Sequence, residues 1–162
     1  MTGDEKQLPE VNDIPILIRR EIEARMAGPL IKALMAKFGE EETLDVVSKV
    51  IESLAAEFGA DLARKQGGNS IADLRRGQAI WSAGGANQRE ILEVTETTYN
   101  YNIVRCKYAD MYRALGLADL GFVLSCKRDG AMFKGFNPRL KFERTQTIMQ
   151  GADYCDFRLT LE

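Results

Sequence analysis

The stretch "CDFRLTL", residues 155–161, alternates strictly between apolar and polar side chains. In an extended chain one face carries Cys155, Phe157, Leu159 and Leu161, and the other carries Asp156, Arg158 and Thr160. This period of two predicts a strand over 154–161 with one face against a core. Further strands are expected at 131–136, at 140–150 and within 91–105, a segment rich in Thr, Val, Ile and Tyr.

The first part of the chain has the 3.6-residue period of helices instead. A first helix is expected over 14–38, with a kink or break at Pro29 and an end at Gly39. Its apolar stripe comprises Ile14, Ile18, Ile22, Met26, Leu30, Leu34 and Phe38. A second helix is expected to run from 40 to the Gly67–Gly68 pair. Its apolar face comprises Val47, Val50, Ile51, Leu54, Phe58 and Leu62. Such stripes serve either a core or a contact with a second subunit, so a homo-oligomer is one expectation.

Shorter helices are expected in the middle of the chain. Ser70 followed by Asp73 resembles a capping box, and "GLADLGFVLSC" predicts a helical stretch ending near Cys126. Helices first and strands last predict an α+β fold, in which N-terminal helices pack on a C-terminal antiparallel sheet of about four strands. We expect a polar lead-in over 1–13 and a single domain over 14–162, helical over 14–82 and rich in strands over 90–162.

Composition narrows the chemistry that the chain can perform. The sequence contains no histidine, which excludes Ser-His-Asp triads, His–Cys pairs and His-ligated zinc. Any acid–base step therefore falls to Asp, Glu, Cys, Lys or Tyr. The net charge is −2, which gives no reason to expect nucleic acid as a partner. Residues 103–144 nevertheless carry 9 basic and 4 acidic side chains, a balance that suits a locally positive pocket for a small anion.

The location and cofactors follow from what the sequence lacks. The polar start does not resemble a signal peptide, and no apolar run approaches the length of a membrane span, so we expect a cytoplasmic protein with no membrane partner. The 3 cysteines are then expected to be reduced thiols. Their wide spacing, without a CxxC pair, gives only weak support for a thiolate metal site, and no phosphate-binding loop is present. No cofactor is expected.

Two polar clusters are candidates for chemistry. In "SCKRDGAMFKGFNP", residues 125–138, the cations after Cys126 favour a thiolate, whereas the end of a helix opposes it. Cys126 is thus either a reactive thiol or a small buried side chain, and Asp129 is either a catalytic carboxylate or the start of a turn with Gly130. In the last strand, Arg158 could hold a carboxylate if a helix covers its face of the sheet. Asp156, on the same face, could then orient Arg158 or take a proton. Otherwise they are a surface pair.

The C-terminal half resembles a known family through an ordered series of motifs. The series contains Cys106 with Tyr108, "LGLADLG", Cys126 with Asp129, "GFNP" and "RTQTIMQGADYCDFR". Together with "RREIEARMAGPLIKAL" near the N-terminus, it is similar to the L-2-amino-thiazoline-4-carboxylic acid hydrolase family over roughly 14–160. More distantly, the order of cysteines and glycines resembles small-ligand domains of the vinyl-4-reductase type, which implies helices on an antiparallel sheet.

The family resemblance implies an enzyme that opens a cyclic amidine with water to give a carbamoyl-cysteine. Either water or a thiolate would attack the ring carbon, and Cys126 is the candidate nucleophile. Cys155 is an alternative nucleophile or a thiolate ligand in a metal site. The resemblance suggests Asp129 or Asp156 as the acid–base group. The substrate, a small molecule with a carboxylate, would be bound by Arg158 or Arg105, together with Tyr108. The vinyl-4-reductase resemblance implies the alternative, a ligand-binding or sensor domain without catalysis.

Overall fold

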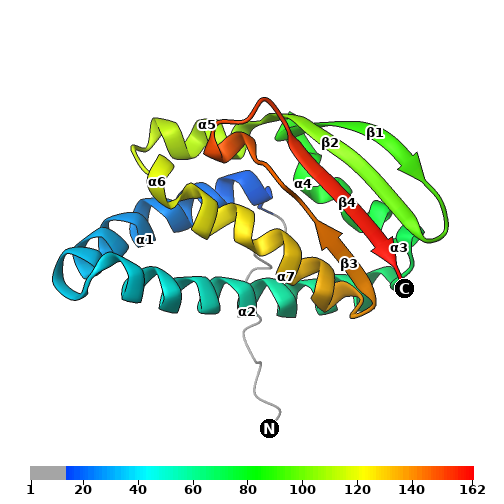
Figure 1. Cartoon of the computed structure of the whole chain (residues 1–162), viewed down its shortest axis with the longest axis horizontal. Coiled ribbons are helices and arrows are strands. Elements are labelled where there is room, and N and C mark those ends of the chain that lie inside the picture. The colour runs from blue at the N-terminus through cyan, green and yellow to red at the C-terminus, as the bar shows by residue number, and fades with distance from the viewer. Residues whose placement is uncertain (1–13) are drawn as a thin grey trace, which may run out of the picture.

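A four-stranded antiparallel sheet forms one side of the computed structural model, which describes residues 14–162 (Figure 1). The strands are β1 (Asn87–Val94), β2 (Thr98–Cys106), β3 (Leu140–Glu143) and β4 (Cys155–Leu161), and their order is β1-β2-β4-β3. β4 lies between β2 and β3, and Phe157 pairs with Tyr101 of β2. The predicted alternation of β4 is confirmed, because Cys155, Phe157 and Leu159 are all buried.

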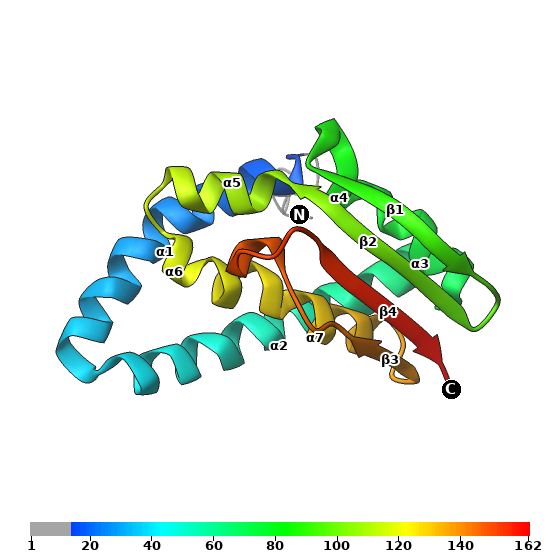
Figure 2. The same cartoon turned by 45° about the horizontal axis from the view of Figure 1, so that its top comes forward.

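Helices cover one face of this sheet, so the predicted α+β class is confirmed. The first two helices are α1 (Ile16–Phe38) and α2 (Glu40–Gln66), which meet at Gly39. Their joined ends lie far from the sheet (Figure 2). Short helices α3 (Ile71–Gly77) and α4 (Ala79–Ser82) and a 3₁₀ turn, η2 (Ala83–Gly85), lead into β1. The capping box of Ser70 and Asp73 at the start of α3 is present as predicted.

The segment after β2 is helical for longer than the sequence indicated. It contains α5 (Lys107–Ala114), α6 (Ala118–Gly121), a π-helical turn η3 (Phe122–Cys126) and α7 (Lys127–Phe136). The predicted strand at 131–136 and the predicted turn at Asp129–Gly130 are therefore wrong, and Cys126 lies within a helical run rather than at its end.

Close helix packing explains why glycines occur inside α7. A Cβ atom on Gly135 would lie 2.0 Å from the Ala56 carbonyl oxygen of α2, and one on Gly59 of α2 would lie 2.1 Å from the Met132 carbonyl oxygen. The two glycines thus let the backbones of α2 and α7 approach closely. This contact favours a helix where the local sequence indicates a strand.

Two other strand predictions need correction. The expected strand within 91–105 is a hairpin, in which β1 and β2 are joined by residues 95–97. Thr95 Oγ1 accepts hydrogen bonds from the Thr97 and Thr98 amides, so a threonine forms the turn without Gly or Pro. The expected strand at 140–150 ends at Glu143, and an irregular segment leads to a 3₁₀ turn, η4 (Ile148–Gln150).

Most of the predicted apolar stripe of α1 points away from the rest of the described protein. Ile18, Ile22 and Met26 are 48%, 59% and 79% exposed. α1 runs through Pro29 without a break and packs through another face, whose buried residues are Ile16, Ala24, Gly28 and Ile31. The face of α1 that its hydrophobicity predicts to be buried is therefore exposed in the described protein. No helix within 14–162 is long and apolar enough to cross a membrane.

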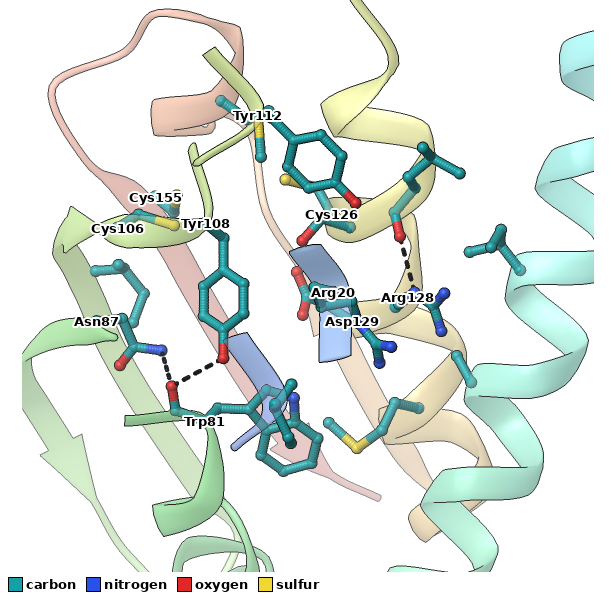
Figure 3. A pocket seen from close by; sticks show the side chains of 18 of the residues that line it. Arg20, Trp81, Asn87, Cys106, Tyr108, Tyr112, Cys126, Arg128, Asp129 and Cys155 are labelled. Carbon is teal, nitrogen blue, oxygen red and sulfur yellow. Dashed lines mark hydrogen bonds between the residues drawn. The ribbon is translucent and has the colours of Figure 1, made fainter. Parts of the chain in front are cut away.

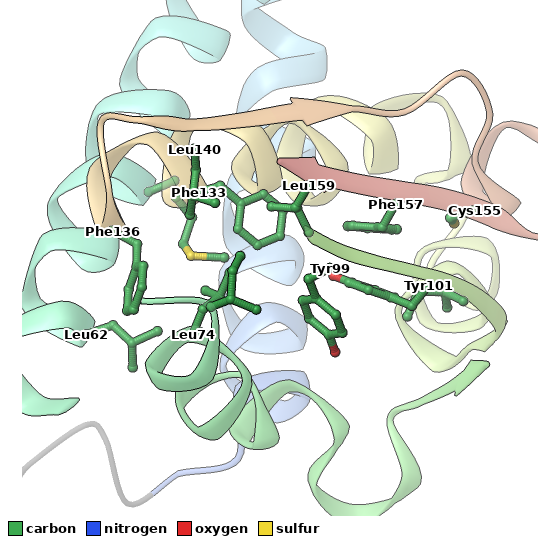
Figure 4. Close-up of a cluster of buried hydrophobic side chains, with 14 residues drawn as sticks. Leu62, Leu74, Tyr99, Tyr101, Phe133, Phe136, Leu140, Cys155, Phe157 and Leu159 are labelled. Atoms are coloured by element: carbon green, nitrogen blue, oxygen red, sulfur yellow. The ribbon is translucent and has the colours of Figure 1, made fainter. Parts of the chain in front are cut away.

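The buried side chains form two main clusters on either side of a hollow. One lies between the sheet and helices α2, α3 and α7, and its labelled members in Figure 4 include Leu62, Tyr101, Phe133 and Leu159. The other joins α1, α2, α5 and α6 and includes Tyr112. The candidate site lies where these clusters meet. Residues 1–13, expected to be a polar lead-in, lie outside the described residues.

Candidate active site

A pocket of about 550 Å³ opens between the inner face of the sheet and helices α1, α2, α5 and α7 (Figure 3). Aromatic rings form much of its wall, among them Phe58, Trp81, Tyr101, Phe133 and Phe157. The volume lies in the range typical of sites for small molecules. The described lining also includes 5 arginines but only 2 carboxylates, so the charge favours an anionic ligand.

The three cysteines all line this pocket. Cys106 ends β2, Cys155 begins β4, and Cys126 projects from the helical side. Burial raises the pKa of each thiol, that of Cys155 to about 11, and the Asp129 carboxylate adds to the effect on Cys126. All three groups are therefore neutral thiols at physiological pH. Within residues 14–162, no three Cys, Asp or Glu side chains are grouped closely enough to hold a metal ion.

The cations next to Cys126 in sequence do not make it a thiolate. Lys127 Nζ donates to Ser48 Oγ at 2.9 Å, on the α2 side. Arg128 Nε donates to the Leu124 carbonyl oxygen at 2.8 Å. Because side chains adjacent in a helix point in different directions, neighbours in sequence do not surround the thiol. The reactive-thiolate interpretation of this stretch is thus not supported by the charges around Cys126.

Asp129 is the carboxylate that the fold places in the pocket beside Cys126. Its Oδ2 accepts a hydrogen bond from Arg144 Nη1 at 2.5 Å, and Arg144 Nη2 donates to the Cys126 carbonyl oxygen at 3.1 Å. Oδ1 has no hydrogen-bond partner within residues 14–162 and remains available to a ligand. Burial raises the pKa of Asp129, and the opposing effect of Arg144 is smaller. An acid whose pKa is raised in this way is suited to exchanging protons near neutral pH.

Arg144 is held in place by aromatic side chains as well as by this ion pair. Its guanidinium lies 5.3–5.9 Å from the ring centres of Phe122, Phe142 and Phe157. Its side chain is only 9% exposed. Cation–π contacts of this kind fix the orientation of a buried guanidinium. Arg144 therefore fixes the position of the Asp129 carboxylate.

The π-helical turn η3 directs side chains into the pocket. The Lys127 amide donates to the Phe122 carbonyl, five residues earlier, instead of four as in an α-helix. The added residue changes the direction of the side chains that follow, and such turns are frequent at functional sites. Cys126 at the end of this turn and Arg128 and Asp129 directly after it all line the pocket.

Two arginines from different helices share one carboxylate at the α1 side of the pocket. Arg20 Nη1 of α1 lies 2.7 Å from Glu23 Oε1, and Arg128 Nη2 of α7 lies 3.2 Å from Glu23 Oε2. Burial, together with the nearby charge of Arg20, lowers the pKa of Arg128 to about 10. Sequence reasoning missed Arg20 and Glu23, because they lie on the polar side of α1. The only available signal was their position beside the small residues of α1, such as Ala24.

Of the three residues predicted to bind substrate, Tyr108 is the one that lines the pocket. Its hydroxyl donates to the Trp81 carbonyl oxygen at 3.2 Å, and Asn87 Nδ2 donates to the same oxygen. Burial raises the pKa of Tyr108 to about 12. Its hydroxyl therefore stays protonated and acts as a fixed wall of the site. Trp81 and Tyr112 also line the pocket and were not predicted.

Three predicted site residues lie elsewhere. Asp156 accepts hydrogen bonds from Thr145 and from the Gln146 amide; despite partial burial, these bonds lower the pKa of Asp156. Arg158 donates to the Tyr101 carbonyl oxygen and to Asn102 on the outer face of the sheet. Arg105 is exposed. None of the three lines the central pocket, so the structure separates them from Cys126 and Asp129.

The fold and the pocket define an α+β domain that can enclose a small molecule. The chain belongs to the L-2-amino-thiazoline-4-carboxylic acid hydrolase family, whose model matches residues 19–159. The resemblance stated from the sequence is thus confirmed at the level of the family. A comparison with curated protein sequences finds no match.

Two solved structures share the fold. The phenol-responsive sensory domain of the transcription activator PoxR with phenol has a TM-score of 0.55 and 14% identity, over 83% of this chain and 72% of that chain. Trafficking protein particle complex subunit 3 from Naegleria fowleri, covalently bound to palmitic acid, has a TM-score of 0.55 and 12% identity, over 90% of this chain and 96% of that chain. At these identities the likeness shows the fold alone.

Proposed function

We propose that the protein is a hydrolase that opens a small cyclic amidine bearing a carboxylate, such as L-2-amino-thiazoline-4-carboxylate. The observation that carries this proposal is Asp129, a carboxyl group of raised pKa with one unbonded oxygen in a pocket rich in cations. Family membership supports the reaction class. The pocket is larger than this single-ring substrate, which leaves room for the water that the reaction consumes.

In the proposed reaction, water attacks the ring carbon that lies between nitrogen and sulfur. Asp129 takes a proton from the water as its oxygen bonds to that carbon, and later returns the proton to the departing ring atom. If the carbon–nitrogen bond breaks, the product is an S-carbamoyl-cysteine, and if the carbon–sulfur bond breaks, it is an N-carbamoyl-cysteine. Either product contains the substrate plus one water.

Cys126 is not the nucleophile in this proposal. Its raised pKa makes direct attack by a thiolate unfavourable, so we assign the nucleophile to water. A covalent route would require the Cys126 proton to pass to Asp129 before the sulfur attacks the ring carbon. The two routes differ in one variant, because Cys126→Ala abolishes the covalent route and leaves attack by water possible.

The test is to incubate the purified protein with L-2-amino-thiazoline-4-carboxylate and to follow products by mass. We expect a product heavier by one water, which Asp129→Asn abolishes without loss of the fold. Asp110→Asn is the matched control, because Asp110 is exposed on α5 and does not line the pocket. Full activity of Asp129→Asn would show that the assigned acid–base group is wrong.

A second candidate function is binding of a small ligand without catalysis. The PoxR sensory domain, which was solved with phenol, shares the fold, and the pocket wall here includes several aromatic rings. Trp81 is the single tryptophan and lines the pocket, so its fluorescence reports binding directly. Saturable quenching by phenol or by the thiazoline compound, with no product of either, would favour this function over hydrolysis.

A further inference from the structure

At the α1 side of the pocket, two guanidinium groups share one carboxylate, and the carboxylate is more exposed than either guanidinium. Arg20 and Arg128 both contact Glu23, and Arg128 is also anchored to the Leu124 carbonyl oxygen. The arginine side chains are 17% and 16% exposed, whereas Glu23 is 46% exposed. Burial restricts both arginines, and the Leu124 carbonyl oxygen anchors Arg128 independently of Glu23, while Glu23 itself faces solvent. A carboxylate from elsewhere could therefore replace Glu23 as the partner of Arg20 and Arg128.

The charge balance favours a second anion at this place. Two partly buried cations share a single carboxylate, and Arg19 of the same helix also lines the pocket. The Arg19 Nε atom is buried and has no hydrogen-bond partner within residues 14–162. Within residues 14–162, Arg20 donates hydrogen bonds only through Nη1. Arg128 donates only through Nε and Nη2. Each guanidinium therefore keeps further N–H groups that a ligand could use. Guanidinium groups with free donors bind carboxylates through paired, charge-assisted hydrogen bonds.

We propose that Arg20 and Arg128 are the binding site for the carboxylate of the ligand, and that Glu23 occupies this site until the ligand displaces it. The assignment of the ligand as a thiazoline carboxylate rests on the proposed function, whereas carboxylate binding itself does not. Arg128 and Asp129 are consecutive on α7 and both line the pocket. A carboxylate held by Arg128 therefore places the rest of a small ligand near the free oxygen of Asp129.

Glu23 acts in this proposal as an internal competitor that sets the affinity of the site. It offsets one of the two arginine charges in the empty pocket, and binding of the ligand must first break its contacts with both arginines. Removing the charge of Glu23 while keeping its size should therefore tighten the binding of an anion. It should leave the binding of a neutral ligand of the same shape unchanged.

The experiment measures Trp81 fluorescence or binding heat at pH 7.5 with two probes. These are L-2-amino-thiazoline-4-carboxylate and 2-amino-thiazole, a ring of similar size that lacks the carboxylate and is uncharged at this pH. We expect Glu23→Gln to lower the dissociation constant of the first probe about tenfold, and Arg20→Gln and Arg128→Gln to raise it at least tenfold. The second probe should respond to none of them. Glu21→Gln and Arg25→Gln, an exposed ion pair on the same helix, are the matched controls.

The outcomes separate this proposal from the proposed function. Binding without turnover that follows the expected pattern supports the arginine site and contradicts hydrolysis of this compound. Turnover with a dissociation constant that Glu23→Gln and Arg128→Gln leave unchanged overturns the arginine site alone. An equal change for both probes also overturns it. If Arg128→Gln does not fold, Arg128→Lys keeps the charge and loses the second contact, and weaker binding of the carboxylate probe alone is expected.

Discussion

Arg144 Nη1 lies 2.5 Å from Asp129 Oδ2, and the same guanidinium reaches the Cys126 carbonyl oxygen. One side chain thus joins the loop after β3 to the first turn of α7. The bond occupies one oxygen of Asp129 and leaves the other facing the pocket. Arg144 is therefore a positioning residue for the proposed acid–base group.

Replacing Arg144 should change the pH dependence of the reaction as well as its rate. Arg144 lowers the pKa of Asp129 against the effect of burial. In Arg144→Gln the pKa of Asp129 rises further. On acidification Asp129 therefore becomes protonated, and inactive as a base, at a higher pH than in the unmodified protein. We expect the acid limb of the profile of kcat/KM to move to higher pH, and the rate at neutral pH to fall by about 10- to 100-fold. A uniform fall without a shift of the limb would mean that Arg144 serves only the fold. Arg144→Lys should keep the limb closer to its original place.

The thiols should be slow to react in the folded protein. Burial raises the pKa of Cys106, Cys126 and Cys155, so few thiolates are present at neutral pH. We expect alkylation by iodoacetamide at pH 7.5 to be at least about tenfold slower in the folded chain than in urea. Peptide mass spectrometry over time assigns the rate to each cysteine. A thiol that reacts quickly, with a midpoint below pH 8, would contradict this environment.

Alkaline pH should destabilise the fold for the same reason. A thiol with a raised pKa holds its proton more tightly in the folded state than in the unfolded state. Its contribution to the free energy of unfolding is therefore complete below the ordinary thiol pKa and falls as the pH rises above it. Urea unfolding between pH 7 and 10 should show this fall, and Cys126→Ala should reduce it. An unchanged slope in the variant would show that Cys126 does not contribute.

The glycines between α2 and α7 should tolerate no side chain. In Gly135→Ala, the new Cβ would lie 2.0 Å from a backbone oxygen, so the helices must separate. We expect a loss of about 1–3 kcal/mol in the free energy of unfolding, although alanine is otherwise favoured in helices. Gly130→Ala on the same helix is the control, because its nearest contact is Phe142 Cδ1 at 3.3 Å. Equal urea midpoints for the two variants would contradict the close packing.

The exposed apolar stripe of α1 should mediate contact with a second copy of the chain. Ile18, Ile22 and Met26 recur every four residues and are exposed, and large exposed apolar patches mark interaction surfaces. We expect a homodimer in sedimentation experiments, and at least a tenfold weaker association for Ile22→Glu. Ile91→Glu, at an exposed apolar position on β1, should leave association unchanged. A monomer at all concentrations tested would contradict a homo-oligomer.

The local sequence pattern correctly predicted helices and strands whose structure depends mainly on their own residues. The alternation of 155–161 identified β4, the glycine at 67 ended α2, and Ser70 with Asp73 capped α3. It failed where packing between distant elements decides. Gly130 and Gly135 indicate a turn and a strand locally, yet both lie inside α7, which packs closely on α2 at Gly135. The hairpin at 95–97 was missed because a threonine side chain makes the turn.

The α+β class, the family and the absence of imidazole chemistry could all be predicted from the sequence, because composition, periodicity and ordered motifs are properties of the chain. Which charged groups meet could be seen only in the folded chain. The fold placed Asp129 beside Arg144 and Cys126, joined Arg20 to Arg128 through Glu23, and put Asp156 and Arg158 outside the pocket. The physical reason is that burial and ion pairing depend on distances between residues far apart in the chain. The pKa of a thiol or carboxyl group is set by those distances and not by its neighbours in sequence.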